Sequence, residues 1–84
     1  MLIYHLPTMS FWYETHSDGV HFIHEIDDDE MGLWSQHHYI LKPDAVQKLF
    51  SIITEKEFIV LCRKEGTTGM VDFFESHDIP YTRE

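Results

Sequence analysis

Basic side chains are absent from the first half of this chain, because residues 1–41 contain no lysine or arginine and all six lie in residues 42–84. The first half instead holds seven of the fifteen acidic residues and six of the seven histidines, so it carries −7 of the formal net charge of −9. A field of this sign repels phosphate groups and argues against direct binding to nucleic acid or to an anionic membrane. We expect a basic protein as the partner.

Disulfides and long apolar runs are also missing. Cys62 is the single cysteine and has no partner for an internal disulfide. No apolar stretch approaches the roughly 18–20 residues that span a bilayer, and the first ten residues lack the features of a signal peptide. A single domain over residues 1–84 is expected, in a soluble cytoplasmic protein whose 43% apolar content is sufficient for folding.

The segment from Ser10 to Ile26 alternates around Asp18-Gly19, which predicts a hairpin with a type I′ turn at those two residues. In this register His16 faces His21. One face of the hairpin then carries the side chains destined for the core, which are Phe11, Tyr13, Thr15, Val20, Phe22, His24 and Ile26. The opposite face carries Trp12, Glu14, His16, His21, Ile23 and Glu25.

The rest of the chain predicts one more strand and then helices. Leu33–Leu41 is expected to be a third antiparallel strand, of undetermined register. Pro43 begins a helical period, Thr54 with Glu57 forms a capping box for a second helix ending at Gly66, and a third helix is expected to end before Pro80. Residues 1–8 either add an edge strand or are disordered. The predicted fold is α+β, a meander of three strands, or four, followed by three short helices packed on one face.

Two opposed histidines on the exposed face raise a metal hypothesis. His16 and His21 at cross-strand distance would supply two positions of a zinc site, with Glu14 as a third ligand. The alternative interpretation is that these are solvated strand histidines, because no cysteine pair or HExxH helix completes the set. A divalent-metal or pH-responsive protein is therefore the alternative function, with zinc as its cofactor.

Catalytic signatures are lacking as well. A ribonuclease would need a lysine or arginine to stabilise the charge of the phosphoryl transition state, and the predicted sheet has none. There is no glycine-rich phosphate loop and no GxSxG motif, and Cys62 falls on the inner face of a helix. We expect no enzymatic activity.

An exposed acidic surface with tryptophans is instead typical of an interface for a basic partner. The expected function is a small inhibitor that occupies a basic surface of a nucleic-acid-binding protein or nuclease. Compact acidic inhibitors of this size include phage anti-defence proteins such as anti-CRISPRs and toxin-neutralising immunity proteins, a likeness of size and charge only. A homodimer through a sheet edge stays open. The predicted partner-binding residues are Trp12, Glu14, Glu25, Asp27, Asp28, Asp29, Glu30 and Trp34.

Overall fold

The sheet is the organising element of this protein. A computed structural model describes residues 1–28 and 33–84, and these residues form an α+β fold with five antiparallel strands in the order β1-β2-β3-β4-β5 and two helices. The class agrees with the sequence prediction, whereas the numbers of strands and helices differ. The elements are β1 (Leu2–Leu6), β2 (Met9–His16), β3 (Gly19–Asp28), β4 (Leu33–Leu41), α1 (Pro43–Ile52), α2 (Glu55–Ser76) and β5 (Thr82–Arg83).

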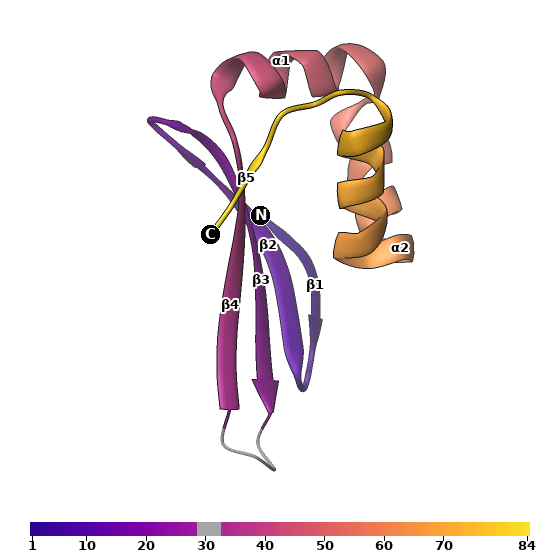
Figure 1. The fold of residues 1–84 in the computed structure, drawn as a ribbon. Coiled ribbons are helices and arrows are strands. Elements are labelled where there is room, and N and C mark those ends of the chain that lie inside the picture. Colours follow the sequence, from indigo (N-terminus) through magenta and orange to yellow (C-terminus); the bar gives the residue numbers. More distant parts are fainter. Residues whose placement is uncertain (29–32) are drawn as a thin grey trace.

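The two helices lie on one side of the sheet. Figure 1 shows α1 crossing one end of the strands and α2 running beside them, while no helix of the described chain covers the opposite face. Strand alternation explains this arrangement, because Phe11, Phe22 and Tyr39 point to the helices and are at most 6% exposed. The face assignment made from the sequence therefore holds for the hairpin.

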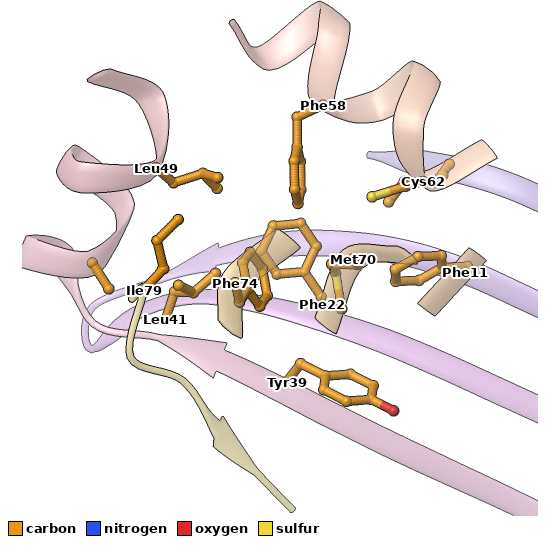
Figure 2. Packing of buried hydrophobic residues seen from close by; sticks show 12 residues of the cluster. Phe11, Phe22, Tyr39, Leu41, Leu49, Phe58, Cys62, Met70, Phe74 and Ile79 are labelled. Carbon is orange, nitrogen blue, oxygen red and sulfur yellow. The ribbon is translucent and has the colours of Figure 1, made fainter. Parts of the chain in front are cut away.

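Aromatic rings make up the centre of the core (Figure 2). Phe58 of α2 stacks on Phe74 at 5.8 Å between ring centroids and meets Phe22 of the sheet edge-on at 5.5 Å. Leu49 of α1 and Cys62 of α2 are fully buried around them. Each buried Phe side chain contributes about 1.5–3 kcal/mol relative to exposure, so this cluster fixes both helices on the sheet.

The predicted hairpin register is wrong by two residues. His16 pairs with Gly19, so that Ser17 and Asp18 form the turn and His21 faces Glu14 rather than His16. Asp18 does not have the positive φ that a type I′ turn requires, and Gly19 instead begins β3 with φ +137°. A Cβ atom on Gly19 would lie 1.9 Å from the backbone oxygen of Leu41, which explains the glycine.

Both ends of the chain add strands to the predicted three. Residues 2–6, left open between an edge strand and disorder, form β1 along β2, with a register shift between Leu2 and Tyr4. The short strand β5 was not predicted. It pairs with Tyr39 and Ile40 of β4.

The helical half contains two helices where three were predicted. The N-cap of the predicted capping box is confirmed, since Oγ1 of Thr54 accepts a hydrogen bond from the backbone nitrogen of Glu57 at 3.1 Å, and the same hydroxyl donates to Oε1 of Glu57 at 2.8 Å.

Gly66, with φ +69° and ψ −161°, lies at the predicted helix end and divides α2 into two helical segments that meet at a sharp kink. The kink brings Phe58 and Phe74 into contact, although sixteen residues of a continuous helix would hold them about 24 Å apart. Helix α2 then ends at Ser76, earlier than the predicted end before Pro80, because the backbone turns at Asp78 with φ +55°. Neither helix combines the length and apolarity needed to cross a bilayer.

Candidate acidic interface

The surface of the sheet that faces away from the helices is called here the outer face. It bears no lysine or arginine in the described strands. Residues 1–41 contain none, and Arg83 of β5 lies on the helix side, because its guanidinium is 5.7 Å over the ring of Tyr39, which points to the helices. Alternation along the paired strands places these residues on it: Ser10, Trp12, Glu14 and His16 of β2, His21, Ile23, Glu25 and Asp27 of β3, and Trp34, Gln36 and His38 of β4.

Hydrogen bonds link the side chains at the hairpin end of the outer face. The indole nitrogen of Trp12 donates to Oε1 of Glu14 at 3.1 Å, and Nε2 of His16 lies 2.9 Å from Oε2 of the same carboxylate. Nε2 of His21 lies 2.9 Å from Oδ1 of Asp18. The contact with His16 and then the hydrogen bond from Trp12 lower the pKa of Glu14. The contact with His21 lowers the pKa of Asp18. Glu14 and Asp18 therefore keep their negative charge to lower pH than ordinary carboxyl groups.

A second group of side chains lies toward the other end of the outer face. Asp27 of β3 is exposed and pairs across the strands with Trp34, whose side chain is 60% exposed. The amide nitrogen of Gln36 donates to Oε2 of Glu25 at 3.3 Å, and its oxygen lies 2.8 Å from Nε2 of His38. Carboxylates and an exposed indole thus share one side of the sheet.

The structure brings together five of the eight predicted partner-binding residues. Trp12, Glu14, Glu25, Asp27 and Trp34 all belong to the outer face. The other three residues are in the acidic run that follows: Asp28 is the last residue of β3, and Asp29 and Glu30 lie outside the described residues. The prediction for that run stays a prediction.

The two tryptophans differ in their surroundings. Trp12 is only partly exposed, and its cross-strand neighbour Ile23 is 4% exposed although it sits on the outer face. On the other side of Ile23 lies His38 of β4. Trp12 and His38 therefore help to shield an apolar side chain, while Trp34 is available to a partner.

His16 and His21 of the metal hypothesis lie close together, but the described residues do not complete a set of metal ligands around them. The rings of His16 and His21 are 4.1 Å apart between centroids, even though the two residues are not directly opposed. Each ring already places its Nε2 against a carboxylate, Glu14 for His16 and Asp18 for His21. In the part of the chain that the structure describes, no three His, Cys, Asp or Glu side chains are grouped as metal ligands would be.

Two titratable groups on the helix side of the sheet, His24 and Cys62, are buried in the core. His24 is 9% exposed, and its Nε2 lies 3.4 Å from the hydroxyl of Tyr4. Its pKa is lowered mainly by burial and to a smaller degree by the nearby His37. Burial raises the pKa of Cys62 to about 12, so the thiol is unreactive at neutral pH. Sequence reasoning missed Gln36 and His38 as outer-face residues, because the alternation of β4 could be used only once its register was known.

Comparisons of this chain with protein-family models, with curated proteins and with solved structures found no match.

Proposed function

We propose that this chain is a small acidic binding protein whose outer face covers a basic surface of a nucleic-acid-binding protein or nuclease. The observation that carries the proposal is the sidedness of the sheet. The helices bury one face, and the other face is left with carboxylates, an exposed tryptophan and no lysine or arginine in the described strands. Such a face is complementary to a groove that ordinarily holds phosphates.

Energetics favour this use of the surface over a purely solvated one. A tryptophan that becomes buried at an interface is a frequent source of binding energy, and Trp34, the cross-strand neighbour of Asp27, is 60% exposed. The carboxylates supply long-range attraction, which accelerates encounter and falls with added salt. Binding should therefore combine a salt-dependent association with an aromatic anchor.

Capture from the source lysate tests the proposal when matched variants are included. The outer-face variant Glu14→Gln/Glu25→Gln/Asp27→Asn and the control variant Glu65→Gln/Asp72→Asn/Glu75→Gln each remove three negative charges, but the control charges lie on α2. The wild-type and control proteins should retain the same basic partner, which elutes with salt. The outer-face variant should retain much less of it.

The captured partner then provides the functional readout. Addition of the wild-type chain should displace nucleic acid from the purified partner or inhibit its nuclease activity, and Trp34→Ala should weaken this inhibition without unfolding the protein. Equal capture by the two charge variants would contradict the role of the outer face. Retention of the partner with its nucleic acid still bound would contradict occupation of a phosphate site.

A further inference from the structure

The β2–β3 hairpin and the two helices surround an open cavity on the helix side of the sheet. Its volume is about 370 Å³, within the range of about 300–1,000 Å³ that is usual for small-molecule sites. Two cross-strand pairs form its sheet wall, Tyr13 with Phe22 and Thr15 with Val20. Because residues two apart in a strand share a face, all four belong to the face that the helices cover. The cavity therefore lies on the opposite side of the sheet from the outer face.

Both helices contribute to the cavity through residues one turn apart. Helix α1 supplies Val46 and Phe50. Helix α2 supplies Glu55, Phe58 and Ile59 from its first turns. Phe50 meets Phe58 edge-on at 6.3 Å between ring centroids, yet Phe50 is 39% exposed. The aromatic core therefore extends into an opening between the helices and the hairpin.

The inner and outer ends of the cavity differ in chemistry. Phe22 and Phe58 meet in the core and are at most 2% exposed, so the inner end is apolar (Figure 2). At the outer end Thr15 and Glu55 are exposed, and the hydroxyl of Tyr13 donates a hydrogen bond to Oε1 of Glu55. A molecule that fits this cavity would be apolar at one end and polar at the other.

The charge in the cavity has one sign. Among the described residues that line it, Glu55 alone is charged. The ion pairs of the described residues use the carboxylates of Glu14 and Asp18, so no cationic side chain there neutralises Glu55. Four of the nine lining residues are aromatic, and aromatic rings favour cations near their faces. The cavity is therefore complementary to a positively charged ligand.

We infer that this cavity is a binding site for a small organic cation, a molecule with one protonated amine on an aromatic or branched apolar body. The amine would pair with Glu55 at the outer end, and the apolar body would fill the space between Phe22 and Phe50. A free small molecule suits the site better than a side chain of the basic partner, because the partner covers the opposite side of the sheet. This inference is independent of the proposed function.

Four probes separate the effects of charge and apolar body. Phenylpropylammonium has both, phenylpropanol replaces the ammonium by a neutral hydroxyl, phenylbutanoate is negatively charged, and propylammonium lacks the ring. Phenylpropylammonium should bind with a Kd on the order of millimolar, as expected for so small a ligand. Phenylpropanol should bind at least about threefold more weakly, and the other two should not bind detectably.

NMR spectra of the full chain locate the bound probe. Phenylpropylammonium should shift the backbone amide signals of Val20 and Phe50. The indole N–H signals of Trp12 and Trp34, which belong to the outer face, should stay unchanged. Shifts confined to the two indoles would place the probe on the outer-face carboxylates and overturn the inference.

Matched variants test the two ends of the site. Glu55→Gln should weaken binding about threefold, whereas Glu65→Gln removes the same charge from an exposed position of α2 outside the cavity and should bind as wild type does. Thr15→Tyr should fill the outer end and abolish binding, while Thr15→Ser keeps the space and should preserve it. Equal binding by the two glutamine variants, or undiminished binding by Thr15→Tyr, would contradict the site.

The probes also test the inference with wild-type protein, so it stays open to refutation if a variant fails to fold. Equal affinity for phenylpropanol and phenylpropylammonium would reject a cationic ligand. Equal affinity for propylammonium and phenylpropylammonium would reject the cavity and assign binding to general attraction by the net charge of −9. Absence of binding of phenylpropylammonium up to its solubility would reject the site altogether.

Discussion

The substitution Gly19→Ala is the sharpest test of the observed hairpin register. Gly19 has φ +137°, a conformation that side-chain-bearing residues rarely adopt, and a Cβ atom there would lie 1.9 Å from the carbonyl oxygen of Leu41 and 2.9 Å from its carbonyl carbon. Both contacts are with backbone atoms that β3–β4 pairing holds in place. The methyl group can be accommodated only if β3 and the end of β4 move apart.

Gly66 provides the matched control. Its φ is +69° and ψ −161°, a region nearly confined to glycine, yet a Cβ atom there would meet nothing within 4 Å. Gly66→Ala should therefore cost only backbone strain, about 1–3 kcal/mol. Gly19→Ala adds the collision to a similar strain and should cost about 4 kcal/mol or more, which is the whole stability of an 84-residue domain at the low end of the usual range of about 4–13 kcal/mol.

Urea unfolding of the two variants, followed by tryptophan fluorescence and far-ultraviolet circular dichroism, measures the difference. The midpoint should fall clearly further for Gly19→Ala than for Gly66→Ala. If the two midpoints fell equally, Gly19 would not approach Leu41. That result would instead favour a turn at Asp18-Gly19, where a methyl group would point into solvent.

Three further predictions follow from titratable groups. Burial and then the hydrogen bond to Glu55 raise the pKa of Tyr13 to about 12, and burial is also the main cause that raises the pKa of Tyr4 and of Tyr81. Ultraviolet titration should therefore show late-ionising tyrosines, one of which Tyr13→Phe removes. Stability should fall between about pH 10, where the unfolded side chains ionise, and pH 12, and it should fall less in Tyr13→Phe. Cys62 should react with a thiol reagent only after denaturation, and rapid labelling of native protein would contradict its burial. Burial lowers the pKa of His24, so its contribution to stability is present above about pH 6.5 and lost as the pH falls below that value; NMR titration of the imidazole checks this, and protonation at the ordinary pKa would refute it.

Face and register were predictable from the sequence to different degrees. A hairpin that slips by two residues keeps every side chain on its own face, so the assignment of Phe11 and Phe22 to the core survived the wrong register. The turn itself was ambiguous, since Ser17-Asp18 and Asp18-Gly19 are both acceptable turn dipeptides. The close approach of Leu41 decides between them, and that contact depends on a strand whose register the sequence left open.

The C-terminal part shows a different limit. The N-cap at Thr54 is a local signal, and it was predicted correctly because Thr54 and Glu57 lie within one turn of helix. Strand β5 has only two residues, too few for any period, and it forms because the backbone turn at Asp78 and the burial of Ile79 direct the chain back along β4. The break predicted at Gly66 is present as the kink within α2, and beyond it the second segment places Met70 and Phe74 in the same core as Phe58.

The charge pattern of the candidate interface was predictable from the sequence, but the difference in exposure between its two tryptophans was not. Trp12 and Trp34 are equivalent in the sequence, each an aromatic residue near carboxylates. In the fold, Trp12 lies beside Ile23 in the middle of the sheet, so removing its indole would expose an apolar side chain and lower stability. Trp34 lies on β4 and is 60% exposed, so the same removal should leave stability almost unchanged. Because only the loss of Trp34 separates binding from folding, Trp34 on β4, and not Trp12 in the middle of the sheet, is where a partner's contribution can be measured.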